Sequence, residues 1–154
     1  MGKKIVIAAD HAGYKVKEQI KGILDGMGME YADLGPDNED SVDYPDFAKK
    51  VAQSVAGGEY DSGLLVCGTG IGMSIAANKV KGIRAAVAWN EESARLSREH
   101  NDANVLTVGA RTTDPEAIPE IVKAFFTTEF EGGRHQRRVD KISEIETPSR
   151  GSAA

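Results

Sequence analysis

The stretch Leu64-Leu65-Val66-Cys67-Gly68-Thr69-Gly70-Ile71-Gly72 determines how this chain is expected to fold. Its first residues are apolar and typical of a buried strand, which the only cysteine of the chain ends. Three glycines at alternate positions follow, and residues 73–79 then predict a helix. A strand, a glycine loop and a helix leave backbone N–H groups free at the helix N-terminus, where they attract an anion. A thiol beside such groups can become a reactive thiolate.

The rest of the chain continues this alternation of strand and helix. Apolar runs predict strands, and stripes of apolar residues at helical spacing predict helices. Strands are expected at residues 5–9, 30–34, 63–67, 83–88 and 104–108, and helices at residues 14–27, 44–56, 73–79, 91–99, 114–131 and 134–146. In the first helix Ile20 and Leu24 lie on the apolar stripe, and Lys17 is expected on the exposed face. Asp114-Pro115 is typical of a helix start, and Pro119 is expected to kink or restart that helix.

Five alternations of strand and helix favour an α/β fold. We expect a doubly wound, five-stranded parallel sheet between two helical layers, a Rossmann-like or flavodoxin-like three-layer sandwich. The length of 154 residues suits a single domain with a sizeable core. Residues 1–146 are expected to form this domain and to end in a C-terminal helix. Residues 147–154 are small and polar and are expected to be a disordered tail.

The composition argues against several classes of function. The net charge is −5, whereas a nucleic-acid partner usually requires a basic face. No run approaches the ~18 apolar residues of a membrane helix, so no membrane partner is expected. The single cysteine excludes an internal disulfide and suits a reducing compartment. The first residues lack the apolar stretch of a signal peptide, so a cytoplasmic protein is expected.

Chemically capable side chains follow three of the predicted strands. Asp10 and His11 come after the first strand, Cys67 ends the third, and Arg111 comes after the fifth. Ligands of parallel sheets bind at the carboxyl ends of the strands. These groups are therefore expected to converge on one edge of the sheet, which no single motif would establish.

The glycine loop does not match the common nucleotide-binding loops. It follows the third strand, whereas the dinucleotide fingerprint belongs after the first, and no Gly-Lys-Ser/Thr follows it. The three histidines, His11, His100 and His135, show no His-x3-His spacing, and there is no Cys-x2-Cys pair. We therefore expect neither a metal nor a cofactor. A tight packing turn and a buried structural thiol remain the alternative interpretations of this loop.

Arg134-His135-Gln136-Arg137-Arg138 is the one basic cluster of the chain. It lies at a predicted helix start, where the helix dipole disfavours cations. Arg134 and Arg138 share one helix face, and two guanidinium groups fit a phosphate dianion. A solvated helix start is the alternative interpretation.

Several motifs together resemble the type B ribose-5-phosphate isomerases, part of a sugar-phosphate isomerase group that includes the galactose-6-phosphate isomerase subunits. The motifs span nearly all of residues 3–146, and they are specific in combination although each alone is modest. They are Asp10-His11, Asp43-Tyr44-Pro45, Cys67-Gly68-Thr69-Gly70-Ile71-Gly72, Ile75-Ala76-Ala77-Asn78-Lys79, Ser97-Arg98-Glu99-His100-Asn101-Asp102, and Gly132-Gly133-Arg134-His135 with Arg138.

The resemblance implies that D-ribose 5-phosphate and D-ribulose 5-phosphate interconvert through a cis-enediolate, a step of the pentose phosphate pathway. It implies that Cys67 is the base, that Thr69 assists catalysis, and that His100 is the acid that opens the furanose ring. Relatives without the cysteine use a glutamate six residues later, where this chain has Met73. The implied substrate contacts are Asp10, His11, Gly68, Gly70, Ile71, Gly72, Asn101, Arg111, Arg134 and Arg138, with His11 and the three arginines on the phosphate.

His100 and Asn101 precede the fifth strand, so they are expected at its amino end, away from Cys67. A site shared between two copies of the chain removes this conflict, and we expect a homodimer, alone or within a dimer of dimers. A six-carbon aldose phosphate, such as allose 6-phosphate or galactose 6-phosphate, is an alternative substrate. A sugar-phosphate-binding module without catalytic activity is an alternative of another class.

Overall fold

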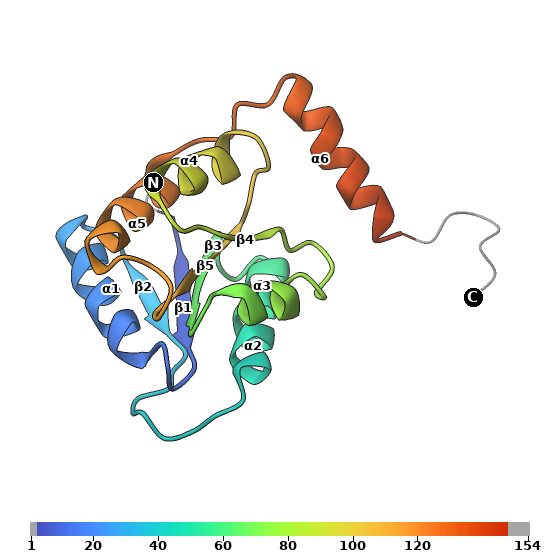
Figure 1. Cartoon of the computed structure of the whole chain (residues 1–154). Helices are drawn as coiled ribbons and strands as arrows, with labels where there is room; N and C mark the ends of the chain where they lie inside the picture. The colour runs from blue at the N-terminus through green and yellow to red at the C-terminus, as the bar shows by residue number, and fades with distance from the viewer. Residues whose placement is uncertain (1–2, 148–154) are drawn as a thin grey trace.

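The computed structural model describes residues 3–147, and its centre is a sheet of five parallel strands (Figure 1). The strands lie in the order β2-β1-β3-β5-β4. Their bounds are Ile5–Ala9 for β1, Tyr31–Asp33 for β2, Ser62–Cys67 for β3, Ala85–Val87 for β4 and Val105–Gly109 for β5. The strands β1, β3 and β5 are buried at every residue, which explains why their sequences are apolar without alternation. The doubly wound, five-stranded parallel sheet expected from the sequence is confirmed.

Helices cover both faces of this sheet (Figure 1). They are α1 (Tyr14–Gly26), α2 (Tyr44–Ala56), α3 (Ile71–Ala77), α4 (Glu91–Glu99), α5 (Ile118–Thr127) and α6 (Arg134–Ile145), with a 3-10 helix, η1, at Pro115–Ala117. The helices α1, α4 and α5 enclose one apolar core against the sheet, and α2 and α3 enclose the other. Successive strand residues alternate between the two cores, so Leu64 lies in the first and Leu65 in the second. This arrangement is the expected three-layer sandwich.

The strand order changes direction between β1 and β3. From β1 the chain adds β2 on one side and then β3 on the other, which creates the switch point where open α/β sheets bind ligands. On the far side of β3 lies β5, with Cys67 opposite Gly109. The carboxyl ends of β1, β3 and β5 therefore lie side by side.

Two helices begin at residues other than those predicted from the sequence. The helix α3 starts at Ile71 rather than at residue 73, because Gly70 has a φ of 78° and turns the chain directly into the helix. Near Asp114 the chain first forms η1, and the Asp114 carboxylate accepts from the N–H of Glu116 over 3.0 Å. The helix α5 then starts at Ile118 with Pro119 in its first turn, where proline is tolerated. The expected restart near Pro119 is therefore confirmed.

The prediction that Lys17 lies on the exposed face of α1 is wrong. Its side chain is fully buried, and its ammonium group donates to both carboxylate oxygens of Asp33 (2.8 and 2.7 Å) and to the carbonyl of Pro36 (2.7 Å). A lysine stem is apolar, so it can cross a core when its charge meets a partner. Burial acts to raise the pKa of Asp33, but hydrogen bonds from Lys17, Lys21 and the N–H of Gly35 outweigh this effect and lower the pKa.

The helix α6 leaves the body of the molecule as an arm (Figure 1). The apolar side of α6 is only partly covered by its own chain, since Val139 is buried while Ile142 is 43% and Ile145 is 83% exposed. The carboxylate of Glu146 accepts from the N–H of Gly82 over 2.9 Å and ties the end of the arm to the body.

The expected disordered tail, residues 147–154, lies outside the described residues apart from Thr147. Within residues 3–147, no helix has the length and apolar character needed to cross a membrane.

Candidate active site

Cys67 ends β3 at the carboxyl edge of the sheet, and its side chain is 5% exposed. The backbone N–H of Gly70 donates to the Cys67 sulfur over 3.2 Å. The sulfur therefore faces the glycine loop and the N-terminus of α3, which are surroundings that reactive cysteines share.

The glycine loop is held tightly against β5. Gly70 has a φ of 78°, and a Cβ atom there would lie 3.0 Å from the carbonyl carbon of Val108, so glycine alone fits without strain. The Gly70 carbonyl accepts from the hydroxyl of Thr107 over 2.8 Å, and the Thr69 hydroxyl accepts from the N–H of Ile71 over 3.2 Å. The first N–H groups of a helix have no carbonyl partner within it. These contacts fix those N–H groups of α3 beside the thiol.

The other residues of the loop contact neighbouring elements directly. A Cβ atom on Gly72 would lie 2.7 Å from the ring of Tyr44, so the start of α3 packs against the start of α2. A Cβ atom on Gly68 would lie 3.4 Å from Nη1 of Arg111, and the Arg111 N–H donates to the Gly68 carbonyl over 2.9 Å. Ile71 is 55% exposed at the mouth of the loop. The structure thus places the exposed Arg111 guanidinium beside the loop, as the sequence predicted.

Asp10 and His11 lie on the turn after β1, next to this loop. Asp10 is buried, its N–H donates to the carbonyl of Val66 over 3.0 Å, and its carboxylate accepts from the N–H of Gly13 over 2.9 Å. The Nδ1 atom of His11 accepts from the N–H of Val42 over 3.1 Å. The hydrogen of a neutral His11 ring is therefore assigned to Nε2, which can donate it to a ligand at this edge.

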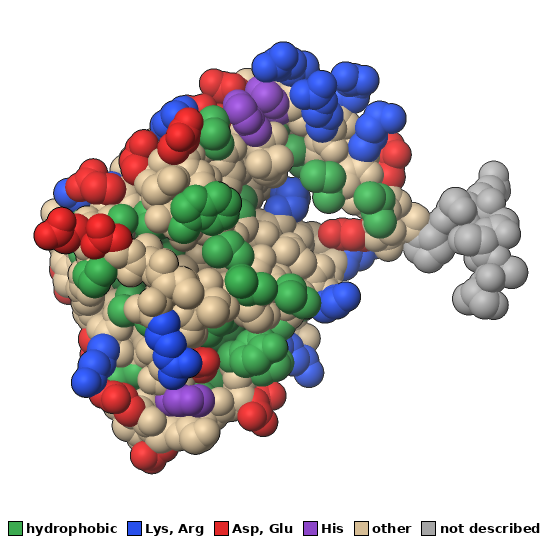
Figure 2. All heavy atoms as spheres, viewed as in Figure 1, with side chains coloured by type: hydrophobic (Ala, Val, Ile, Leu, Met, Phe, Trp, Pro, Cys, Tyr) green, Lys and Arg blue, Asp and Glu red, His purple; other side chains and the backbone are tan. Residues whose placement is uncertain are grey.

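The remaining predicted site residues gather at the amino end of β5. His100 caps the C-terminus of α4, and Asn101 follows it. Arg134 and Arg138 reach the same place from the start of α6. All four line one hollow of about 290 Å³, together with His135, Val139 and Ile142. Figure 2 shows the basic side chains of α6 beside two of the histidines.

His135 belongs to this second group although the sequence did not predict it as a site residue. Its side chain is buried, and its ring stacks on that of His100 with a centroid distance of 4.3 Å and an interplanar angle of 14°. Its Nε2 lies 3.4 Å from the carboxylate of Glu131. The sequence feature that could have indicated this contact was the spacing of four residues between Glu131 and His135, next to the arginine pair.

His100, Glu131 and His135 bring three potential metal-ligating atoms within 4.8 Å of one another. The sequence did not predict this cluster, because His100 is distant from the other two in the chain. The lone pair of an imidazole nitrogen lies in the plane of its ring. The two stacked rings are nearly parallel, so their lone pairs do not point toward one shared metal position. Arg134 and Arg138 also place positive charge on the same hollow. This arrangement suits an anion better than a cation.

The two groups of predicted site residues lie at opposite ends of the sheet. Cys67 lies opposite Gly109, the last residue of β5, whereas His100 precedes Val105, the first. Figure 2 shows the same separation, since one histidine lies far from the other two.

The residues that the resemblance implies on the phosphate are divided between these ends. His11 and Arg111 belong to the group around Cys67, and Arg134 and Arg138 belong to the group around His100. A strand of five residues is ~16 Å long. One phosphate therefore cannot contact all four side chains of a single chain.

Comparisons with known proteins agree with the motifs. The family model described as Ribose/Galactose Isomerase matches residues 5–142. Ribose-5-phosphate isomerase B of Escherichia coli is 49% identical over 144 residues, which cover 94% of this chain and 97% of that protein. The structure of Clostridium thermocellum ribose-5-phosphate isomerase B has a TM-score of 0.90 and 53% identity, and covers 93% of this chain and 97% of its own. The structure of the Mycoplasma genitalium enzyme with bound ribulose-5-phosphate has a TM-score of 0.90 and 44% identity. It covers 95% of this chain and 97% of its own. This chain therefore belongs to the ribose/galactose isomerase family.

Proposed function

We propose that this protein is an aldose–ketose isomerase that interconverts D-ribose 5-phosphate and D-ribulose 5-phosphate. The contact between the Cys67 sulfur and the N–H of Gly70 carries this proposal, because it places a proton acceptor beside the N-terminus of α3. Relatives named ribose-5-phosphate isomerase B and the related structure with bound ribulose-5-phosphate support this substrate. The reaction belongs to the pentose phosphate pathway, and a cytoplasmic location fits it.

In the central step, the Cys67 thiolate takes the proton from C2 of the open-chain aldose. The electrons of the broken C–H bond form a C1=C2 double bond, and the carbonyl oxygen on C1 becomes negatively charged. Backbone N–H groups of residues 68–72 stabilise this charge, which exists only along the reaction path. A proton passes from O2 to O1 with the help of Thr69. The Cys67 thiol then returns its proton to C1 and leaves a ketone at C2.

The closed furanose ring of ribose 5-phosphate must open before this step. His100 donates a proton to the ring oxygen as the bond from that oxygen to C1 breaks. The C1 hydroxyl loses its proton to Asp10, so the aldehyde forms without net proton transfer to solvent. Asn101 contacts the sugar hydroxyl groups. No metal or cofactor takes part in this scheme, because the charge forms beside fixed backbone donors.

A complete site combines the two ends of the sheet from different copies of the chain. One copy supplies Cys67, the glycine loop, His11 and Arg111, and the other supplies the hollow lined by His100 and the α6 arginines. The four cationic side chains then meet at one phosphate, which acts as a handle that orients the sugar. The smallest assembly with this property is a homodimer with twofold symmetry and two equivalent sites. A dimer of dimers would keep the same sites.

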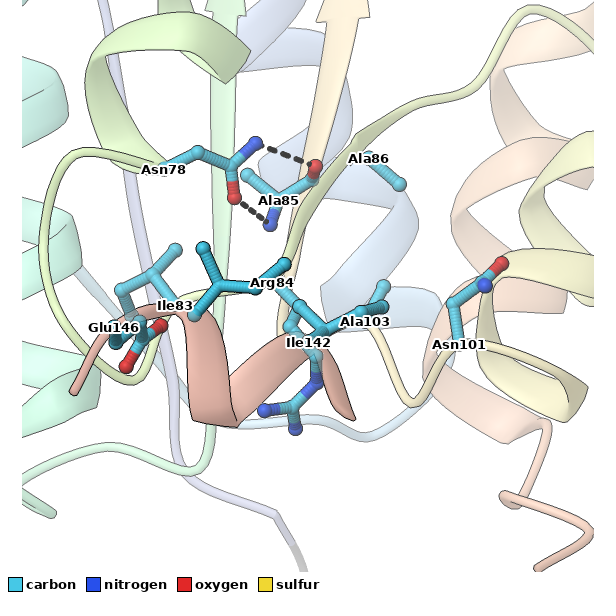
Figure 3. A pocket seen from close by; sticks show the side chains of 10 residues that line it. Asn78, Ile83, Arg84, Ala85, Ala86, Asn101, Ala103, Ile142 and Glu146 are labelled. Atoms are coloured by element: carbon cyan, nitrogen blue, oxygen red, sulfur yellow. Dashed lines mark hydrogen bonds between the residues drawn. The ribbon is translucent and has the colours of Figure 1, made fainter. Parts of the chain in front are cut away.

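The β4 edge and the α6 arm support a dimer that packs through helices. At the β4 edge the amide of Asn78 donates to the carbonyl of Ala85 (3.0 Å) and accepts from its N–H (2.8 Å), as a neighbouring strand would (Figure 3). This contact occupies backbone groups of β4 with which an edge strand of a second sheet would have to pair. Ile142 and Ile145 instead line a hollow of about 510 Å³ under α6 and leave apolar surface for a partner.

The conversion of ribose 5-phosphate into ribulose 5-phosphate by the purified protein tests the proposal. We expect turnover, and a loss of ~10²–10⁴ in kcat for Cys67→Ser with a much smaller change in KM. Allose 6-phosphate and galactose 6-phosphate in the same assay provide the comparison with six-carbon substrates. A protein that binds these sugar phosphates but turns over none of them would contradict the proposal.

A further inference from the structure

Asp102 has a left-handed backbone conformation, with a φ of 46°, and it is the only residue other than glycine within residues 3–147 to do so. It follows His100 and Asn101 and leads the chain from α4 toward β5. Aspartate is among the residues that tolerate this conformation best, but a strained residue persists only where its surroundings enforce it. Such residues concentrate at functional sites.

Two arginines enforce the conformation of Asp102. Nη1 of Arg98 lies 2.9 Å from one carboxylate oxygen, and Nη2 of Arg84 lies 3.4 Å from the other. Nε of Arg84 also donates to the Asp102 carbonyl over 2.9 Å. Arg98 donates further to the carbonyls of Ala103 (2.6 Å) and Thr128 (3.1 Å). We refer to Arg84, Arg98 and Asp102 together as the Asp102 clamp.

The Asp102 clamp ties the loop that follows His100 to three rigid elements. Arg98 belongs to α4, and its guanidinium lies 5.8 Å from the ring centroid of the buried Phe125 on α5. Arg84 directly precedes β4, and Figure 3 shows it with Asn101 on the wall of the hollow under α6. The hollow that contains His100 is lined by none of the three clamp residues. The clamp therefore supports the loop from behind rather than contacting a ligand in that hollow.

We propose that Asp102 is a positioning residue that holds His100 in the orientation needed for ring opening. The ring of His135 restricts one face of the His100 ring, and the Asp102 clamp fixes the backbone that carries His100. The kinetic part of this inference rests on the proposed function, whereas the placement of the ring does not.

The placement of the His100 ring is measured directly by NMR. The chain has three histidines, so their Cε1–H signals are assignable with single His→Asn variants. We expect one narrow His100 signal in the unsubstituted protein, and a broadened or doubled signal in Asp102→Ala. A narrow, unshifted His100 signal in Asp102→Ala would overturn the inference.

Kinetics separate ring opening from proton transfer. Ribulose 5-phosphate is open-chain, because its C5 oxygen carries the phosphate and cannot close a five-membered ring. Exchange of its C1 hydrogens with D₂O therefore requires Cys67 but no ring opening. For Asp102→Ala we expect isomerisation of ribose 5-phosphate to fall about tenfold to a hundredfold, while exchange stays within about twofold. His100→Asn is expected to show the same pattern.

Two further variants complete the test. Asp102→Asn retains the tolerance for a left-handed φ and an oxygen for the arginines, and it is expected to recover most of the lost isomerisation. Arg95→Met removes an α4 guanidinium that pairs with Glu91 and Glu99 of the same helix, and it is expected to leave both rates unchanged. Equal losses of exchange and isomerisation in Asp102→Ala would contradict the inference. If the unsubstituted protein fails to isomerise, the proposed function fails, and the His100 signal still decides the role of Asp102.

Discussion

The backbone N–H of Gly70 donates to the sulfur of Cys67 over 3.2 Å. This contact joins the last residue of a buried central strand to the left-handed glycine from which α3 starts. The strand positions the thiol, and the glycine aims the helix N-terminus at it. The proposed base and the proposed donors for a developing oxyanion thus arise from one local arrangement of the backbone.

Replacing Gly70 with alanine is expected to damage both stability and activity. The φ of 78° is unfavourable for alanine, and its Cβ atom would meet the backbone of Val108 at 3.0 Å. We expect Gly70→Ala to lower the free energy of unfolding by about 1–3 kcal/mol. We also expect it to reduce kcat at least about tenfold, because the N–H groups beside Cys67 move. Urea unfolding and steady-state kinetics measure these effects.

Gly22 provides a matched control for this substitution. It lies in α1 and is exposed, and a methyl group added to it would meet no neighbouring atom within 4 Å. Gly22→Ala is expected to raise the free energy of unfolding by about 0.5–1 kcal/mol without changing kcat. Equal behaviour of the two alanine variants would show that the conformation of Gly70 has no special role.

The sequence predicted those features that depend on local patterns. Ile5–Ala9 and Ser62–Cys67 are apolar on both faces, which identified central parallel strands, and alternation with helices then determined the sheet. Parallel strands place their carboxyl ends together, so Asp10, Cys67 and Arg111 could be grouped before any contact was known.

The features that the sequence did not predict depend on contacts between distant segments. Lys17 looked like an exposed charge because its partners, Asp33 and the Pro36 carbonyl, lie beyond its helix. His135 looked like part of a basic helix start because its stacking partner, His100, comes from another helix. The spacing of residues along a helix shows which of them share a face, but it does not show which other segments that face contacts.

Removal of Lys17 is expected to destabilise the fold more than removal of Lys21. Lys17 is fully buried, whereas the side chain of Lys21 is 28% exposed and lies at the surface. We expect Lys17→Met to lower the free energy of unfolding by about 2–3 kcal/mol, because it leaves the Asp33 carboxylate and the Pro36 carbonyl without their buried donor. Lys21→Met is expected to cost less than about 1 kcal/mol. Urea unfolding of both variants tests this order, and the reverse order would contradict it.

The stability of the protein is expected to depend on the ionisation of Asp33. Hydrogen bonds from Lys17, Gly35 and Lys21 outweigh the effect of burial and lower the pKa of Asp33 in the folded chain. A lowered carboxyl pKa stabilises the fold above the unfolded value of about 3.9, and this contribution is lost as the pH falls through the folded value. The difference in free energy of unfolding between the unsubstituted protein and Asp33→Asn is therefore expected to shrink below about pH 4. A difference that does not change with pH would show that this charge contributes nothing.

The central claim is that each active site combines Cys67 from one copy of the chain with His100 from another. Cys67→Ala and His100→Asn proteins, each expected to have little isomerase activity alone, can be unfolded together in equal amounts and refolded. Random pairing makes half of the dimers mixed, and each mixed dimer has one site with both residues intact. We therefore predict recovery of about a quarter of the unsubstituted activity. No recovery above the two separate variants, with mixed dimers demonstrated by mass spectrometry, would contradict a shared site.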